Sequence, residues 1–348
     1  MRILVHVDDF ACTFTSRELY NKVFGAMQKQ FNITDYGAKP IERFLGICVE
    51  KTPDGKYRLH QQPYINEILC RLNMQDCKPA ATPERVGTSA KLRPTGSLTT
   101  SEEKFMQKIP YREAVGALFY LCRGTRFDIT HAVSEVARFM SNPSPQHWDA
   151  VLRIYRYLSR TKSTALVMQS SKLKCEITEQ SLEGFSDSDW AGCPITRKSH
   201  TGWLVRVGGS LVAWYSKKQS TLAQSVTEAE YIAASALANE IIWWRRLLCD
   251  LGYDLTKPTK LWTDNRAAAI LSKHECNFEA AKHIELRYHV LRDYHNRNLI
   301  QLEWKKSAKM WADILTKNCS QKLFLRVANQ LLGEDLPPLN VRGGRTRV

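Results

Sequence analysis

The stretch LEGFSDSDW, residues 182–190, has apolar residues at Leu182 and Phe185 and then runs into closely spaced aspartates. A short segment of this kind that ends in small acidic residues predicts a β-strand followed by an acidic turn. The next stretch, TGWLVRVGGSLVAWYSKK at residues 201–218, has two apolar segments separated by Gly208 and Gly209. Such a glycine pair predicts a hairpin turn, so three antiparallel strands are expected in succession.

Outward from these strands, the chain predicts a long helix from about Ser225 to Asp250. A fourth strand is expected in TKLWTDN at 259–265, then two helices, a fifth strand in LIQLEWKK at 299–306 and a final helix. Three antiparallel strands, a helix, a strand, helices and a strand form an α/β pattern. We therefore expect an α+β or α/β fold.

Four acidic residues of this half lie at the ends of expected elements: Asp187, Glu230, Asp264 and Asp313. Asp313 is expected to open the final helix or to lie within it. Strand ends and helix starts can converge on one point, and carboxylates gathered there repel one another unless cations bind between them. Two Mg²⁺ ions held by such a group can activate water and stabilise a leaving oxygen in phosphodiester cleavage. Taken alone, each residue is more typical of a turn or a helix cap than of a catalytic site.

Two of the four positions have a neighbour that competes for the same role. Ser225 and Glu228 fit a capping box, which favours Glu230 as the ligand, but Thr227 and Glu230 fit the same box. Asp189 is likewise an alternative to Asp187. The residues alone leave both choices open.

The first half of the chain opens with VHVDDF at residues 5–10, read as two strands with a turn at Asp8 and Asp9. Adjacent carboxylates of this kind suit half of a metal site. A further hairpin is expected around Asp54-Gly55. Residues 79–108, rich in Pro, Thr, Ser and Lys, are expected to form a linker, and residues 111–160 several helices.

The composition favours a polyanionic partner. The chain of 348 residues carries a formal net charge of +15, which suits nucleic acid or an anionic surface. Its ten cysteines show no paired spacing, as expected of reduced intracellular thiols. The longest apolar runs are too short to span a bilayer, so we expect no membrane association.

Several of these stretches resemble the Pol polyprotein of copia-type LTR retrotransposons. GFSDSDWAG, RKSHTGWLV, TDNRAAAIL and ADILTK resemble its ribonuclease H part, whose carboxylate tetrad matches Asp187, Glu230, Asp264 and Asp313. VHVDDF resembles the aspartate-pair box of reverse transcriptases, with His6 where tyrosine is usual. RFLGICVE, QQPYINEIL and residues 111–158 resemble the palm end, thumb and connection.

The resemblance implies a truncated palm, thumb and connection followed by a ribonuclease H-like five-stranded mixed sheet with helices. The expected domains are, in chain order, palm and thumb start (1–78), linker (79–108), helical thumb and connection (109–180), ribonuclease H-like domain (181–319), and C-terminal helix with basic tail (320–348). We expect the nuclease domain to fold autonomously.

The resemblance also implies a function: hydrolysis of RNA in an RNA–DNA hybrid with two Mg²⁺ ions, for which Mn²⁺ can substitute. Template-primer nucleic acid, a dimer, or the upstream polymerase part are further expected partners. The expected location is intracellular, in cytoplasmic virus-like particles or the nucleus. Asp8 and Asp9 match the polymerase metal pair, but the family's remaining catalytic aspartate and fingers should lie upstream, so we expect no primer extension by this chain alone. The alternatives are an inactive nucleic-acid-binding element and a structural partner of a full-length polymerase.

Overall fold

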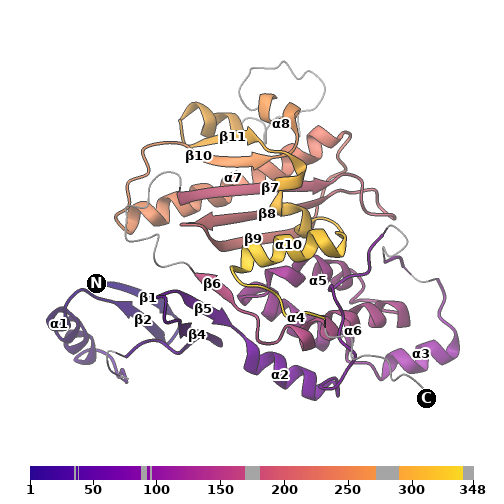
Figure 1. Cartoon of the computed structure of the whole chain (residues 1–348), viewed down its shortest axis with the longest axis horizontal. Helices are drawn as coiled ribbons and strands as arrows, with labels where there is room; N and C mark the ends of the chain where they lie inside the picture. Colours follow the sequence, from indigo (N-terminus) through magenta and orange to yellow (C-terminus); the bar gives the residue numbers. More distant parts are fainter. Residues whose placement is uncertain are drawn as a thin grey trace.

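The computed structural model describes most of the chain, namely residues 1–34, 37, 39–87, 92–94, 96–168, 181–271 and 290–339. A five-stranded sheet with a long helix forms one layer, a group of helices packs beside it, and the N-terminal strands lie to one side (Figure 1). None of the described helices is long and apolar enough to cross a membrane.

The five-stranded sheet has the strand order β11-β10-β7-β8-β9. Its members are β7 (Leu182–Asp189), β8 (His200–Val207), β9 (Ser210–Lys218), β10 (Thr259–Thr263) and β11 (Ile300–Trp304). β7, β8 and β9 pair antiparallel in succession, whereas β10 runs parallel to both β7 and β11. The expected five-stranded mixed sheet is therefore confirmed, and β7 lies at its centre.

Helix α7 (Val226–Asp250) covers one face of this sheet. A Cβ atom on Gly184 of β7 would lie 2.8 Å from Leu237 Cδ1, so glycine allows the helix to rest directly on the strand. The short helix α8 (Arg266–Leu271) follows β10, and the 3₁₀ helices η5 (Ser307–Lys309) and η6 (Trp311–Leu315) follow β11.

The helical group contains seven described elements: α2 (Gln62–Arg71), α3 (Thr100–Gln107), α4 (Tyr111–Gly124), η2 (Phe127–Ile129), α5 (Thr130–Ala137), α6 (Pro145–Arg160) and α10 (Gln321–Leu332). Helix α3 lies within the stretch expected to be a linker, so that expectation is wrong for residues 100–107. Thr99 and Glu102 form a full capping box at its start, which offsets the poor helix propensity of the surrounding residues.

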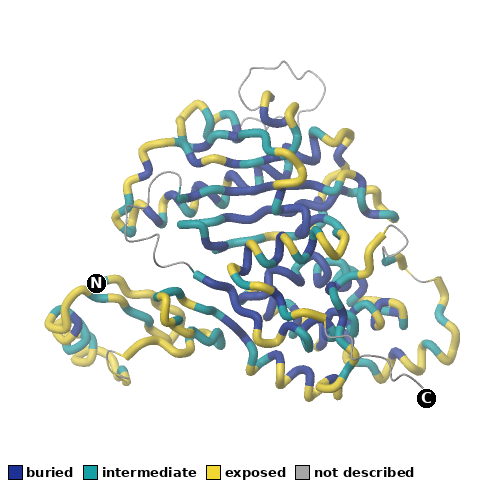
Figure 2. Tube along the Cα trace, in the orientation of Figure 1, coloured by how far each residue is buried: buried dark blue, intermediate teal, exposed yellow. Residues whose placement is uncertain are grey.

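The N-terminal strands β1 (Arg2–His6) and β2 (Asp9–Thr13) form a separate hairpin, followed by α1 (Arg17–Gln28). The turn residues are Val7 and Asp8, because Asp9 already belongs to β2; this corrects the expected turn by one residue. Every residue of β1 is exposed, and Figure 2 shows the hairpin as a largely exposed unit. Among the described strands, β1 pairs with β2 alone.

A second sheet joins β3 (Arg43–Phe44), β4 (Ile47–Lys51), β5 (Tyr57–His60) and β6 (Leu166–Met168) in that order. The predicted turn at Asp54-Gly55 is confirmed between β4 and β5, with Gly55 at a φ of 81°. This sheet connects the N-terminal strands to the helical group, because β6 follows α6 in the chain.

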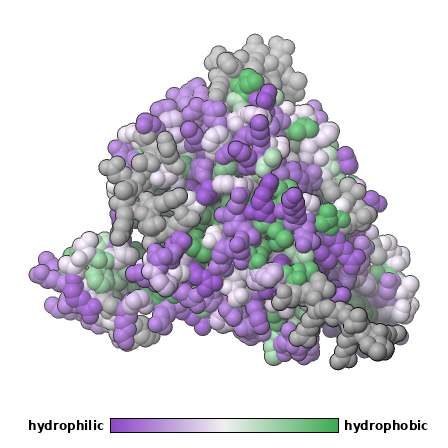
Figure 3. Space-filling model, viewed as in Figure 1, coloured by the Kyte–Doolittle hydropathy of each residue, from purple (hydrophilic) through white to green (hydrophobic). Residues whose placement is uncertain are grey.

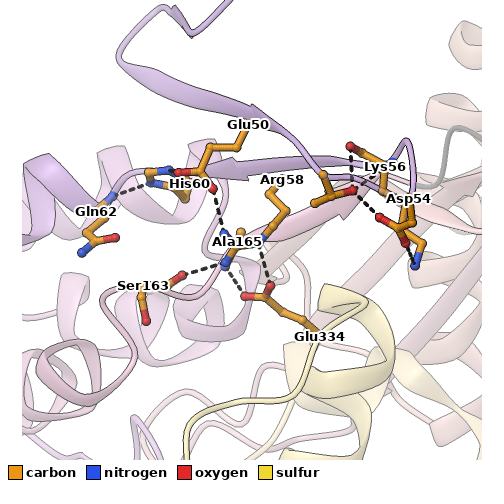
Figure 4. Close-up of polar contacts among 10 residues, drawn as sticks. Glu50, Asp54, Lys56, Arg58, His60, Gln62, Ser163, Ala165 and Glu334 are labelled. Atoms are coloured by element: carbon orange, nitrogen blue, oxygen red, sulfur yellow. Dashed lines mark hydrogen bonds and ion pairs between the residues drawn. The ribbon is translucent and has the colours of Figure 1, made fainter.

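A network around Arg58 fixes this second sheet to the end of the chain (Figure 4). The guanidinium donates to Glu50 Oε2 at 2.8 Å, to Glu334 Oε2 at 3.1 Å and to the Ser163 carbonyl at 3.2 Å. The other oxygen of Glu334 accepts from the Ala165 amide at 2.6 Å. The segment after α10 is therefore tied to β5 and to the start of β6.

One apolar core runs through the helical group and reaches the five-stranded sheet. It includes Val115 and Leu158 from the helices, Phe185 and Leu204 from the sheet, and Leu331 from α10. Hydrophilic residues cover much of the face seen in Figure 3. The domain boundaries after residues 180 and 319 stay a prediction, but the core is continuous across both. The predicted basic tail, VRGGRTRV at residues 341–348, lies outside the described residues.

Candidate metal and active site

Asp187 lies near the end of the central strand β7, where the residue is only 1% exposed. Its Oδ2 accepts a hydrogen bond from the Thr316 hydroxyl and lies 3.5 Å from Lys317 Nζ. Burial raises the pKa of the Asp187 carboxyl, and Lys317 and Thr316 partly oppose that effect. The sequence left Asp187 and Asp189 as alternatives, and the structure places Asp187 in the carboxylate group.

Glu230 lies in the second turn of α7 and is 2% exposed. Its Oε1 accepts hydrogen bonds from the Ser188 amide at 3.0 Å and hydroxyl at 2.8 Å. Burial, followed by the charge of Asp187, raises the pKa of Glu230 well above its usual value. Glu230 is therefore held against the end of β7.

Glu228, the alternative to Glu230, makes different contacts. Ser225 Oγ accepts from the Glu228 amide at 3.1 Å, and Glu228 Oε2 accepts from the Gln224 amide at 2.8 Å. Both contacts satisfy backbone groups at the start of α7. Glu228 therefore serves the helix start, and Glu230 faces the sheet.

Asp264 follows the last residue of β10, beside the end of β7. Its Oδ2 accepts from the Ser307 hydroxyl at 2.8 Å, and its carbonyl accepts from Trp304 Nε1 at 3.1 Å. One carboxylate oxygen each from Asp187, Glu230 and Asp264 lies within 4.8 Å of the others. Three elements distant in sequence thus bring three acidic groups to one point.

Asp313 lies in the 3₁₀ helix η6 and not in the final α-helix, so the expected placement in that helix is corrected. Its Oδ1 is 3.0 Å from Lys317 Nζ, the same ammonium that lies beside Asp187. Burial, with the charge of Asp187 next, raises the pKa of Asp313 to about 6. Asp313 therefore borders the group through Lys317.

The sequence did not predict a role for Thr316 and Lys317, which contact the carboxylates of the site. Burial works against the charge of Lys317, but the carboxylates of Asp187 and Asp313 raise its pKa. The one available signal was the four-residue spacing from Asp313 to Lys317, which places both on one side of a helical turn. The contact of Thr316 with Asp187 depends on tertiary structure and has no local signal.

These residues suit small divalent cations. The donors are carboxylate oxygens, which Mg²⁺ and Mn²⁺ prefer. Burial and mutual repulsion raise the pKa values of Asp187, Glu230 and Asp313. A bound cation would offset the repulsion between their negative charges. The donor set therefore fits the expected magnesium site, with Asp187, Glu230 and Asp264 as its centre.

Asp8 and Asp9 lie apart from this group. Both are exposed, at the tip of the β1–β2 hairpin. Among the described residues, two groups of three or more side chains could hold a metal, and neither contains Asp8 or Asp9. Three residues predicted for the nuclease, Asp187, Glu230 and Asp264, therefore lie together in the folded chain. The predicted polymerase pair, Asp8 and Asp9, belongs to neither group.

Known proteins similar to this chain include retrotransposon polyproteins. It is 36% identical to the retrovirus-related Pol polyprotein from transposon TNT 1-94 of Nicotiana tabacum, over 95% of this chain and 24% of that protein. It is 32% identical to the Pol polyprotein from transposon RE2 of Arabidopsis thaliana, over 97% of this chain and 22% of that protein. The chain thus spans about a quarter of the length of these curated relatives.

A shorter relative is matched over most of its own length. The uncharacterized mitochondrial protein AtMg00810 of Arabidopsis thaliana is 36% identical over 70% of this chain and 94% of that protein. No protein-family model matches the chain.

The comparison with solved structures includes two matches, both with TM-scores below 0.5. The foamy viral protease-reverse transcriptase in complex with RNA/DNA hybrid is 13% identical, with a TM-score of 0.47 over 91% of this chain and 37% of that one. The N-terminal RNase H domain of a Mycobacterium tuberculosis protein is 14% identical, with a TM-score of 0.29 over 44% of this chain and 98% of that one.

Proposed function

Since the chain belongs to the family of copia-type retrotransposon Pol polyproteins, we propose that it is a metal-dependent ribonuclease that cleaves the RNA strand of an RNA–DNA hybrid. The observation that carries this proposal is the group of the buried Asp187 and Glu230 with the partly buried Asp264, whose ligand oxygens lie within 4.8 Å of one another. Two divalent cations bound there would supply an activated water and stabilise the leaving oxygen.

The residues around the group prepare it for this chemistry. Ser188 and Thr316 donate to Glu230 and Asp187, which fixes the direction of each carboxylate. Ser307 does the same for Asp264. The ammonium of Lys317 lies beside Asp187 and Asp313 and balances part of their charge when no cation is bound.

The proposed substrate follows from family and charge. A net charge of +15 favours binding to phosphates, and binding of this kind weakens as salt rises. Cleavage confined to RNA requires contacts that detect the 2′-hydroxyl of one strand. We propose that Asp8 and Asp9 give no polymerase activity in this chain by itself.

The test is cleavage of a labelled RNA–DNA hybrid by two neighbouring variants. Asp187→Asn should reduce Mg²⁺-dependent cleavage by about a hundredfold or more, because a cation ligand is lost. Its binding to the hybrid should persist or strengthen, because a charge that repels phosphate is removed. Asp189→Asn, the same change two residues away, should keep most of the activity.

Equal cleavage by wild type and Asp187→Asn would contradict the proposal. Binding of the hybrid without cleavage by the wild-type chain, in either Mg²⁺ or Mn²⁺, would instead support the alternative of an inactive nucleic-acid-binding element.

A further inference from the structure

A second group of potential ligands lies outside the carboxylate site. It consists of His131 and Glu135 on α5 and His200 at the start of β8, each offering one ligand atom within 4.8 Å of the others. Both histidines are 6% exposed, and their ring centroids lie 4.9 Å apart at an interplanar angle of 72°. The group joins the helical part of the chain to the five-stranded sheet.

A carboxylate fixes the hydrogen position on His131. Its Nδ1 lies 2.8 Å from Glu84 Oε2. An ionised carboxylate can only accept, so Nδ1 carries the hydrogen and the neutral ring keeps its lone pair on Nε2. A histidine whose outer nitrogen donates to a carboxylate is the arrangement typical of metal-bound imidazole.

A hydroxyl fixes His200 in the same way. Ser216 Oγ donates to the Leu315 carbonyl at 2.6 Å, so it accepts from His200 Nε2, which is 2.8 Å away. The lone pair of the neutral His200 ring is then on Nδ1. That atom lies 3.8 Å from Glu135 Oε1.

Glu135 is oriented by Arg138. The guanidinium donates to Glu135 Oε2 at 2.7 Å, so Oε1 is the oxygen directed toward His200. His131 and Glu135 are four residues apart, which places both on one face of α5. Two imidazole nitrogens and one carboxylate oxygen therefore converge.

We propose that His131, Glu135 and His200 bind a divalent transition-metal ion of the Zn²⁺ type, which links α5 to β8. Imidazole favours Zn²⁺ over Mg²⁺, so this donor set differs from the all-carboxylate site. Ligands of one tetrahedral zinc lie about 3.3 Å apart, given bonds of about 2.0–2.1 Å. The separation of 3.8 Å between Glu135 and His200 needs only a small side-chain adjustment.

The surroundings leave room for a fourth ligand. The three residues line a cavity of about 250 Å³, whose wall also includes Asp189 and Cys193. A water molecule from this cavity would complete a tetrahedron with three protein ligands. The charge of the cation would also be balanced by Glu84 and Glu135.

The test is calorimetric titration of the full, reduced chain with ZnCl₂, with the carboxylate site saturated by Mg²⁺. The wild type should bind one more Zn²⁺ than His200→Gln or Glu135→Gln. His60→Gln is the matched control, because His60 is also buried and paired with a glutamate, Glu50, at 2.9 Å (Figure 4). It should keep the full wild-type stoichiometry.

Thermal unfolding distinguishes a variant that has lost a Zn²⁺-binding side chain from one that no longer folds. Zn²⁺ should raise the Tm of the wild type and of His60→Gln but not that of Glu135→Gln, which changes a half-buried side chain and keeps its size. Co²⁺ should give the visible absorption of a tetrahedral site in the wild type and not in Glu135→Gln. If the wild type and Glu135→Gln bind the same number of Zn²⁺ ions and show equal Tm shifts, the proposal is overturned. The three residues would then form a hydrogen-bonded cluster that binds no metal.

Discussion

Buried carboxylates that repel one another make the metal-free site sensitive to pH. Asp313 has a pKa raised to about 6, so in the folded chain it holds its proton more tightly than in the unfolded chain. Its contribution to stability is therefore complete below about pH 4 and is lost as pH rises through about 6. Asp187 and Glu230 shift in the same direction.

This linkage predicts that Mg²⁺ stabilises the chain more at pH 7.5 than at pH 5. At pH 5 Asp313, whose pKa is about 6, mostly holds its proton, which must leave before the cation binds. Thermal unfolding with and without Mg²⁺ at the two pH values measures the difference. A Tm shift on adding Mg²⁺ that is as large at pH 5 as at pH 7.5 would contradict the assigned titration.

The ammonium of Lys317 competes with the cation for the same carboxylates. Lys317→Met should therefore tighten Mg²⁺ binding by about three- to tenfold, a modest factor because the side chain is 39% exposed and solvent screens its charge. Calorimetric titration with Mg²⁺ measures it. Lys260→Met is the control, because it removes the same charge from an exposed residue near the start of β10 and should leave the Mg²⁺ affinity unchanged. Weaker Mg²⁺ binding by Lys317→Met would show that Lys317 supports the cation site instead.

At the residue scale, sequence indicated the acidic members of the site but not their partners. Asp187, Glu230, Asp264 and Asp313 stand at element ends, where local patterns are readable. The hydrogen bonds from Ser188, Thr316 and Ser307 connect residues 42, 129 and 43 positions apart, so nothing local could predict them. The choice of Glu230 over Glu228 also needed the observed cap at Ser225.

At the element scale, the position of η6 decides whether Asp313 and Thr316 reach the site. Gly202 of β8 makes this possible, because a Cβ there would lie 2.6 Å from Thr316 Cγ2 and 2.8 Å from Leu315 Cβ. A side chain on β8 would push the end of η6 away from the sheet.

Gly202→Ala should therefore destabilise the chain by about 1–3 kcal/mol and lower hybrid cleavage. Denaturant unfolding and the cleavage assay measure the two effects. Gly116→Ala is the control, because a Cβ added to this residue of helix α4 would meet no atom within 4 Å and alanine favours a helix. Unchanged stability and activity in Gly202→Ala would mean that η6 tolerates displacement.

Elements with a clear period or turn signal were predicted well. The glycine pair placed the β8–β9 hairpin, and Ser225 placed the start of α7. Helix α3 was missed because the Pro- and Thr-rich composition around it outweighed its capping box. The 3₁₀ form of η6 was missed because its packing against β8, a tertiary effect, fixes its geometry.

At the scale of the whole molecule, the two predicted metal sites have unequal surroundings. The carboxylates proposed for the nuclease are buried or partly buried where β7, α7 and β10 meet, whereas Asp8 and Asp9 are exposed on a two-stranded hairpin. The family resemblance predicted a carboxylate tetrad for the nuclease and only a residual pair for the polymerase, and the difference in burial between them became visible only in the folded chain.

The purified chain should therefore fail to extend a primer on RNA or DNA templates under conditions in which it cleaves a hybrid. Exposed carboxylates on a hairpin bind a cation weakly, and nucleotide transfer needs a cation clamped by further groups. Incorporation of labelled nucleotides measures the activity. Template-dependent incorporation that is lost in Asp8→Asn would show that a carboxylate elsewhere completes the polymerase site.

The central claim is that the carboxylates from β7, α7, β10 and η6 together hold two divalent cations. Anomalous diffraction from crystals of the chain, grown with Mn²⁺ and an RNA–DNA hybrid that cannot be hydrolysed, tests it most directly. We expect two manganese peaks about 4 Å apart, in contact with Asp187, Glu230, Asp264 and Asp313. Manganese found elsewhere, with none among these four carboxylates, would contradict the account.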